Sequence, residues 1–282
     1  MTGNVSVVVS TYNRPDALEL CLRSLMYQSR LPDEIIVGDD GSRPDTAEVI
    51  DRLRALAPIP LVHVWQEDRG FRLAAIRNKA VMASSGQYII QIDGDIIAHP
   101  RFVEDHMHFA RPGYFLRGGR ALLGPALTAE LCRDRVPRPV HIWTPGISKA
   151  TNTLRIPPLA RYLAPRYRPS AYVLGCNMSF HKSDFLAVNG YDEHFEGWGG
   201  EDSDFFRRLR LNGVRHLRLK FAAIAYHLYH DEASRHNQAH NDLYSTRPHP
   251  DIYCADGADK YSIAGDTCPA GDHIPKARSA GP

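Results

Sequence analysis

Short apolar runs alternate with helical stretches over roughly the first 95 residues, and this alternation constrains the fold more than any other feature of the chain. The Val-rich run 5–9 is typical of a strand that is covered on both faces. Pro15 and Pro44 each fit the first turn of a helix, where the N–H that proline lacks would be unpaired anyway. Further strands are predicted at 34–40, 61–65 and 87–93. Strands that alternate with helices predict an open, mostly parallel α/β sheet.

The rest of the chain is less regular. Between about residues 111 and 170, prolines, glycines and arginines interrupt short apolar pieces. Such an insertion is more often a lid or a binding loop, with disorder as the alternative. A strand-like stretch follows at 171–180, whereas 249–282 has little periodicity and is expected to be loosely packed or disordered. We therefore predict a single domain over 1–248, followed by a tail.

Charge and cysteine content exclude several classes of protein. The 282 residues include 34 Lys and Arg against 32 Asp and Glu, a net charge of +2 that does not indicate nucleic acid as a partner. The five cysteines are scattered and form no CxxC pair, which argues against a zinc site or a disulfide framework. No charged leader precedes an apolar run, and no stretch of about 18 apolar residues occurs. We expect a cytoplasmic chain that does not span a membrane.

The stretch QIDGDIIAHP at residues 91–100 is the sharpest local signal. An apolar strand ends in Asp93, Gly94 and Asp95, so two carboxylates lie at the carboxyl edge of the sheet, where open α/β sheets bind ligands. Two acids this close repel one another unless a cation lies between them, and oxygen ligands suit Mg²⁺ or Mn²⁺ holding a diphosphate. The alternative is a solvated turn, because Asp-Gly is a common turn dipeptide.

A second signal is FEGWGGEDSDFFRRL at residues 195–209. Asp202 has the helical spacing of the apolar residues that follow it, Phe205, Phe206 and Leu209. A carboxylate on the buried face of a helix is costly unless it is paired or faces a cleft, which favours a functional role for Asp202. Trp198 is interpreted as a flat wall beside Asp202, and Gly199 as a hinge there. In the alternative interpretation, the tryptophan is structural. The alternative to a functional role is that the acids of the first turn only stabilise the positive end of the helix. These acids are Glu201, Asp202 and Asp204.

Histidines follow a third strand-like run, in AIAYHLYHDEASRHNQAHN at residues 223–241. Neutral imidazole is a good ligand for ions such as Mn²⁺, so a histidine here would complete a metal site begun by the two acids of the DGD stretch. His227 and His230 are the candidates. Surface exposure is the alternative, and it is the commoner outcome for any single histidine.

Together these stretches resemble family 2 inverting glycosyltransferases of the GT-A fold. The C-terminal half resembles the galactosyltransferase-type module of chondroitin polymerases and β-1,4-galactosyltransferases. The resemblance extends from Val5 to about His230 and rests on the motifs VSVVVSTYN, GDDGS, DRGFRLAAIRNKA, QIDGDI, GCNMSF and WGGEDSDF. It implies a nucleotide-binding half over 1–110, in which helices flank the sheet, and an irregular acceptor and catalytic half over 111–248.

The turn STYNRP after the first strand has no glycines to cradle a phosphate. The resemblance implies that this turn holds the nucleobase and that a metal ion holds the diphosphate. It places Ser10 and Tyr12 at the uracil and ribose, and Asp40 where a carboxylate accepts the uracil N–H. The predicted donor-binding residues are Ser10, Tyr12, Asn13, Asp40, Arg77, Asn78, Asp93, Trp198 and Gly199.

The resemblance also implies the metal ligands and the catalytic groups. Asp93 and Asp95 match the DxD pair, and His227 matches the third ligand of Mn²⁺ or Mg²⁺, with His230 in reserve. In the WGGED motif, Asp202 matches the general base. Its neighbour in the motif, which would contact the acceptor or the donor sugar, is Glu201.

These matches imply a metal-dependent inverting hexosyltransferase. The donor would be a UDP-sugar, of galactose or N-acetylhexosamine type, and the acceptor a glycan or a lipid-linked saccharide of cell-surface polysaccharide synthesis. Arginines in the segment 133–168 would contact the acceptor or the inner face of the cell membrane, or only solubilise a loop. A sugar-1-phosphate nucleotidyltransferase and a dinucleotide-dependent oxidoreductase would each need a glycine-rich loop after the first strand. This chain has no such loop there. The alternatives are a non-catalytic module that binds sugar nucleotides or glycans, or a sugar-1-phosphate nucleotidyltransferase.

Overall fold

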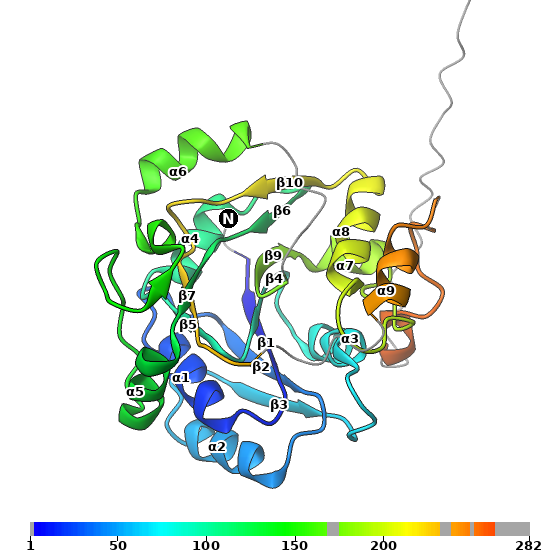
Figure 1. Cartoon of the computed structure of the whole chain (residues 1–282). Coiled ribbons are helices and arrows are strands. Elements are labelled where there is room, and N and C mark those ends of the chain that lie inside the picture. Colours follow the sequence, from blue (N-terminus) through cyan, green and yellow to red (C-terminus); the bar gives the residue numbers. More distant parts are fainter. Residues whose placement is uncertain (1–2, 168–174, 232–237, 249–250, 263–282) are drawn as a thin grey trace, which may run out of the picture.

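Seven strands form the central sheet of the computed structural model, which describes residues 3–167, 175–231, 238–248 and 251–262. They lie in the order β10-β6-β9-β4-β1-β2-β3 (Figure 1). Their bounds are β1 Val5–Thr11, β2 Glu34–Asp39, β3 Leu61–Trp65, β4 Tyr88–Asp93, β6 Tyr114–Arg117, β9 Asn177–His181 and β10 Arg215–Arg218. Strands β4, β1, β2 and β3 are parallel, whereas β9 is antiparallel to β4 and β6. The predicted mostly parallel α/β sheet is confirmed.

Helices cover both faces of this sheet because successive side chains of a strand point to opposite sides. Val5, Val7 and Val9 of β1 pack with α1 (Pro15–Met26) and α2 (Pro44–Arg54). Val8 packs on the other face, with α3 (Leu73–Ala83) and α8 (Glu201–Leu211). The remaining covering helices are α4 (Phe102–Phe109) and α7 (Lys182–Ala187). Among the described residues, none of the helices has the length and apolar character needed to cross a bilayer.

A smaller sheet lies beside the carboxyl edge of β4. Its order is β5-β11-β7-β8, with bounds β5 Ile96–Ala98, β11 Ala225–His227, β7 Arg120–Leu123 and β8 Ile147–Ser148. Strand β11 is antiparallel to β5, with His227 opposite Ile96, and the N–H of Leu228 donates to the carbonyl of Asp95 over 2.9 Å. This pairing brings the predicted third metal ligand to the DGD turn, across more than 100 residues of sequence.

The middle region is more ordered than the sequence predicts. Besides β6, β7 and β8 it contains α5 (Pro125–Asp134), α6 (Pro157–Leu163) and the 3-10 turns Ala150–Thr153 and Ala164–Arg166. Each of the two helices begins at a proline and buries only a few side chains, so neither gives a long apolar periodicity. The strand expected at 171–180 begins at Asn177, and residues 168–174 lie outside the described part of the chain.

Part of the tail is packed, contrary to the expectation of a loose segment from residue 249. Helix α9 (Gln238–Ser245) precedes it. Cys254 and Ala258 are buried, and Asn189 both donates to the carbonyl of Cys254 over 2.8 Å and accepts from the N–H of Asp259 over 2.8 Å. The short helix Ala258–Tyr261 packs against α3. Local periodicity did not reveal this segment because its order comes from distant residues. The division into a 1–248 domain and a tail stays a prediction, and 249–250 and 263–282 lie outside the described residues.

Replacing Gly257 should test the packing of this segment. A Cβ at Gly257 would lie 2.1 Å from the backbone oxygen of Asn189, so Gly257→Ala forces the tail away from its contacts. Overpacking of this kind costs about 1–3 kcal/mol, and each kcal/mol lowers Tm by about 2–4 °C in a chain of this size. Thermal unfolding measures the loss, with the exposed Ala255→Ser as the matched control. An unchanged Tm for Gly257→Ala would show that the segment is not packed in solution.

Candidate active site

The carboxyl ends of the central parallel strands converge on one edge of the sheet. Ser10 at the end of β1 lies in register with Asp93 at the end of β4. The N–H of Gly94 donates to the carbonyl of Ser10 over 2.7 Å, which holds the DGD turn against β1. Asp40 directly follows β2. The sequence signals of three strands therefore meet at the edge where open α/β sheets bind ligands.

Arg77 of α3 joins this edge to the first turn of α8. Its side chain is only 1% exposed. One terminal nitrogen donates to Asp202 over 2.9 Å and to Glu201 over 3.2 Å, and the other donates to Asp93 over 3.2 Å. Its Nε donates to the hydroxyl of Ser10 over 3.4 Å. Four of the predicted site residues thus share one buried guanidinium.

The carboxylates outnumber the positive charge in this cluster. Burial raises the pKa of Glu201 to about 7, with the charge of Asp202 adding to the effect and Arg77 opposing it. Burial also raises the pKa of Asp202, again against Arg77. The same carboxylates hold the pKa of the Arg77 guanidinium above its usual range, although burial lowers it. The cluster therefore favours a proton or a further cation.

The carboxylate of Asp202 is fixed in place yet reachable. Its Oδ2 accepts the N–H of Gly175 over 2.7 Å, while Oδ1 accepts Arg77, and the side chain is 16% exposed. A Cβ at Gly175 would lie 2.2 Å from Oδ1, so only glycine lets the backbone approach this closely. Each carboxylate oxygen has a second lone pair, so Asp202 can still accept a proton from a group in the cleft.

Asp95, His227 and His230 form a cluster with the geometry of a metal site. One ligand atom from each residue lies within 4.8 Å of the others. The Nε2 of His227 lies 3.5 Å from Asp95 Oδ1, and that of His230 lies 3.4 Å from Oδ2. Oδ1 of Asp95 is buried and has no hydrogen-bond partner among the described residues, which is costly unless a cation is present. Carboxylate and imidazole ligands fit Mn²⁺ and accommodate Mg²⁺.

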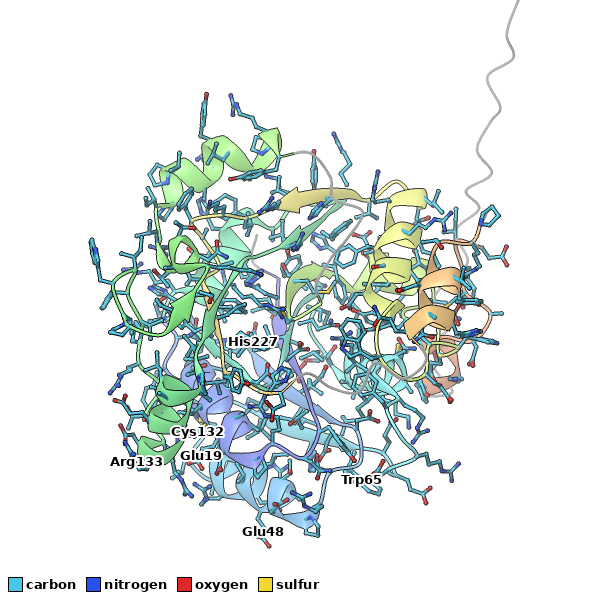
Figure 2. The ribbon with its side chains drawn as sticks, viewed as in Figure 1. Glu19, Glu48, Trp65, Cys132, Arg133 and His227 are labelled. Carbon is cyan, nitrogen blue, oxygen red and sulfur yellow. The ribbon has the colours of Figure 1, made fainter. Side chains whose placement is uncertain are left out.

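The structure brings together a ligand set that differs from the predicted one. His230, the reserve candidate, joins His227 at Asp95, with ring centroids 5.2 Å apart (Figure 2 shows His227 near the centre of the molecule). Asp93 is not a member of this cluster, since it is paired with Arg77. Arg14 also donates to Asp95 Oδ2 over 2.8 Å, a contact that no sequence signal indicated.

Tyr12 and Asn13 lie at the exit of β1 without joining the Arg77 cluster. Tyr12 is 45% exposed, and its hydroxyl donates to Asp68 over 3.0 Å, which raises the pKa of the phenol. Asn13 has a positive φ of 49°, and its side-chain oxygen accepts the N–H of Arg43 over 2.9 Å. Tyr12 therefore presents an accessible aromatic face at the edge of the sheet, whereas Asn13 shapes the turn.

Asp40 is buried and already hydrogen-bonded. It accepts from the side-chain amide of Gln66 over 2.5 Å and from the N–H of Arg72 over 2.8 Å. Burial raises the pKa of its carboxyl. The predicted contact of Asp40 with uracil would use the remaining lone pairs of this carboxylate, and it stays a prediction.

Three other predicted donor residues lie outside the Arg77 cluster. Asn78 is fully buried and holds the loop after α7, exchanging hydrogen bonds of 2.8 Å with the backbone of Tyr191. Trp198 and Gly199 directly precede α8, with the carbonyl of Trp198 accepting from Asn241 over 3.3 Å and Gly199 in the left-handed region at φ 86°. Asn78 therefore has a structural task here, and the donor roles of all three stay predictions.

Sequence reasoning missed the residues that position this site. Tyr191 lies under Arg77, with the guanidinium carbon 5.4 Å from the ring centroid. Gly175 holds Asp202, and Arg120 lies beside Cys176 with its terminal nitrogen 3.0 Å from the sulfur. The GCNMSF motif contained Gly175 and Cys176, but it gave no sign of what they would contact.

Comparison with known proteins confirms the resemblance drawn from the sequence. Residues 6–115 match the model of glycosyl transferase family 2, and residues 159–231 match that of the N-terminal domain of galactosyltransferase. The chain is 29% identical to a validoxylamine A glucosyltransferase of Streptomyces hygroscopicus subsp. limoneus over 74% of its own length and 48% of the relative. It is 27% identical to a chondroitin synthase of Escherichia coli over 79% of its own length and 34% of the relative. The chain thus spans about half or less of these relatives.

Solved structures share the fold. The mannosyltransferase PcManGT from Pyrobaculum calidifontis, in complex with GDP-Man and Mn²⁺, has a TM-score of 0.58 at 18% identity, covering 86% of this chain and 61% of its own. TarS 1–349 of S. aureus, in complex with UDP-GlcNAc, has a TM-score of 0.56 at 19% identity, covering 82% of this chain and 60% of its own. The predicted GT-A fold is confirmed, and the relatives and neighbours are glycosyltransferases, as predicted.

The surroundings of Glu201 predict that Glu201→Gln raises Tm, and that the increase depends on pH. The folded-state pKa of about 7 lies above the usual value of 4.5, so native Glu201 holds a proton that the unfolded chain has released. The contribution of this proton to the stability of the folded chain is complete below pH 4.5 and is lost as the pH rises through 7. Glu201→Gln should therefore raise Tm relative to wild type by several degrees at pH 8 and by less at pH 5.

Thermal unfolding across this pH range measures the difference. The exposed Glu48, which Figure 2 shows at the periphery, provides the matched control Glu48→Gln, whose Tm should follow the wild type at every pH. A gap between Glu201→Gln and wild type that stays constant from pH 5 to pH 8 would contradict the assignment.

Proposed function

We propose that this chain, with its match to glycosyl transferase family 2, is a metal-dependent inverting glycosyltransferase that moves a sugar from a UDP-sugar to an acceptor hydroxyl. One observation carries the proposal: Arg77 joins Asp93, beside the candidate metal ligands, to Asp202, which is a carboxylate suited to be a base. A leaving-group site and a proton acceptor thus lie on opposite sides of one guanidinium. Transfer between two oxygen atoms requires both.

The donor would bind along the carboxyl edge of β1, β2 and β4. Tyr12 has an exposed ring at this edge, which suits stacking against a nucleobase. Asp40 and Ser10 would contact the uracil and the ribose, as the resemblance implies. TarS, which shares this fold, was crystallised with UDP-GlcNAc, and this supports UDP as the nucleotide.

Asp95, His227 and His230 would hold the metal ion. The buried unpartnered oxygen of Asp95 and the two imidazoles supply a donor set that fits Mn²⁺ or Mg²⁺. When bound, such an ion neutralises the negative charge that develops on a departing diphosphate. The PcManGT structure contains Mn²⁺, which supports a divalent cation in this fold.

The chain's own residues would move the proton. An acceptor hydroxyl hydrogen-bonded to Asp202 gives its proton to that carboxylate while its oxygen attacks the anomeric carbon. The bond between that carbon and the diphosphate oxygen breaks, its electron pair leaves with UDP, and the configuration inverts. Burial raises the pKa of Asp202, which makes the carboxylate a stronger base than an exposed aspartate, while Gly175 and Arg77 fix its orientation.

The matches to known proteins bear on the sugar and the acceptor. The match of residues 159–231 to a galactosyltransferase domain favours galactose or an N-acetylhexosamine, whereas the validoxylamine A relative is named as a glucosyltransferase. The chondroitin synthase relative supports a glycan acceptor and a place in polysaccharide synthesis. A lipid-linked acceptor and peripheral contact with the inner face of the membrane are part of the same proposal.

Asp202→Asn should separate transfer from donor binding. The amide cannot accept the proton, so transfer should fall by about 10²- to 10⁴-fold. The affinity for UDP with Mn²⁺ should stay within a few-fold, because no contact of the nucleotide is assigned to Asp202. Donor hydrolysis and isothermal titration with UDP measure the two quantities. Full activity in Asp202→Asn would remove the assignment of the base.

The cluster of Asp95, His227 and His230 predicts which substitutions remove the dependence of UDP binding on Mn²⁺. With UDP and Mn²⁺ at about 100 times the dissociation constant, wild type should gain about 2.7 kcal/mol of stability. Asp95→Asn, His227→Ala and His230→Ala should each lose most of that gain, whereas the exposed His108→Ala should keep it. Thermal unfolding with UDP, with and without Mn²⁺, measures the effect. If His230→Ala behaves like wild type, the ligand set is wrong.

A non-catalytic sugar-nucleotide module is the competing function. It would bind UDP with the same metal dependence but would not hydrolyse or transfer the donor. Wild-type donor hydrolysis that needs Mn²⁺ and is lost in Asp202→Asn distinguishes the transferase from such a module.

A further inference from the structure

A cavity of about 180 Å³ beside the candidate active site is lined by positive side chains. It lies where β6 turns into β7, against the end of β10 and the 3-10 turn Ala150–Thr153. None of its lining residues is acidic, and its cations are Arg117, Arg120, Lys149, Arg218 and Lys220. Pockets for whole drug-sized ligands measure about 300–1,000 Å³, so this cavity suits one charged group rather than a nucleotide sugar.

The cavity shares a wall with the site of the predicted base. Cys176 lines it, and Arg120 donates to the sulfur of Cys176 over 3.0 Å. The preceding residue, Gly175, donates to Asp202. Arg120 also begins β7, which pairs in parallel with β11, the strand that ends at His227. A molecule whose hydroxyl reaches Asp202 therefore passes close to the cavity.

Four of the five cationic side chains that line the cavity form no ion pair with a carboxylate within the part of the chain that the structure describes. Among the described residues, no ion pair joins a carboxylate to Arg120, Lys149, Arg218 or Lys220. The Nε of Arg120 is buried and has no hydrogen-bond partner there. The fully buried arginines among the described residues are paired with carboxylates, Arg77 with Asp202 over 2.9 Å and Arg208 with Asp204 over 2.6 Å.

The sequence around the cavity is also poor in acidic residues. No aspartate or glutamate occurs between Asp134 and Asp184, although this segment contributes Lys149 and Cys176 to the cavity wall. Over the whole chain acids and bases are nearly balanced, at 32 against 34. The buried Nε of Arg120 has no hydrogen-bond partner among the described residues, which is costly, so a bound anion that accepts from it would remove that penalty.

We propose that this cavity is an acceptor subsite for an anionic group, a phosphate or a carboxylate. The proposal rests on the function proposed above, in which the acceptor hydroxyl lies beside Asp202. The anion would accept hydrogen bonds from Arg218, Lys220 and the unpartnered Nε of Arg120. A neutral acceptor would leave these donors unsatisfied, so the subsite selects acceptors that carry a negative charge close to the hydroxyl that reacts.

Anion titrations test the subsite without an acceptor. Inorganic phosphate and glucuronate are titrated separately by calorimetry into wild type, first without ligand and then saturated with UDP and Mg²⁺ to fill the donor site. At least one anion should bind in both conditions with comparable affinity. Tighter binding of phosphate would identify a phosphorylated acceptor, and tighter binding of glucuronate an acidic sugar.

A double variant locates the binding. Arg218→Gln with Lys220→Gln should weaken the anion at least tenfold, since charge-assisted hydrogen bonds are among the strong ones. Arg215→Gln, in the same strand β10 but not in the cavity lining, should bind the anion as wild type does. UDP affinity with Mg²⁺ should stay unchanged in both variants, which also shows that they are folded.

Three results would overturn the subsite: neither anion binds, the double variant binds as tightly as wild type, or UDP with Mg²⁺ abolishes the binding. Failure of the function proposed above would be seen separately. In that case UDP would not bind in the presence of Mg²⁺, or no donor hydrolysis would occur, whatever the anions do.

Discussion

The guanidinium of Arg77 is the interaction on which the site depends. It is buried and held by carboxylates from β4 and α8, which lie 16 and 124 or more residues away in the sequence. A buried charge is tolerated only when it is paired and hydrogen-bonded, so α3, β4 and α8 must take these positions together. Without Arg77, three carboxylates would face one another across the edge of the sheet. The contact thus joins the two matched halves of the chain and orients the predicted base.

The carboxylates at the edge of the sheet outnumber the positive charge around Arg77. One guanidinium neutralises one of the three carboxylates it contacts, and Asp95 adds another acid two residues from Asp93. Arg14 offsets part of the charge of Asp95, while Oδ1 remains without a hydrogen bond among the described residues. Burial, with the charge of Asp202 adding to it, keeps the pKa of Glu201 high, and the excess of negative charge would favour the binding of a divalent ion.

The sequence predicted the parts that have local signals. The strands β1 to β4, the DGD turn and the α8 motif each give a periodicity or a spacing that a single segment reveals. Arg77 was placed in the donor site by resemblance, but its role as the common partner of Asp93 and Asp202 depends on distant packing. The same holds for His230, which reaches Asp95 only because β11 pairs with β5. The packed tail and the cationic cavity were missed because residues far apart in the chain form them.

The two charged regions on either side of Asp202 have opposite sign, and this has a consequence for the reaction. A negatively charged acceptor that approaches Asp202 meets Glu201 and Asp93 as well, and like charges at short range oppose its binding. The cavity at Arg120, Arg218 and Lys220 would supply the compensating attraction beside the Gly175–Cys176 segment. An acceptor held there would place its anion against these cations while its hydroxyl reaches Asp202. The same arrangement separates the acceptor's charge from that of the diphosphate, so both substrates can occupy one edge of the sheet.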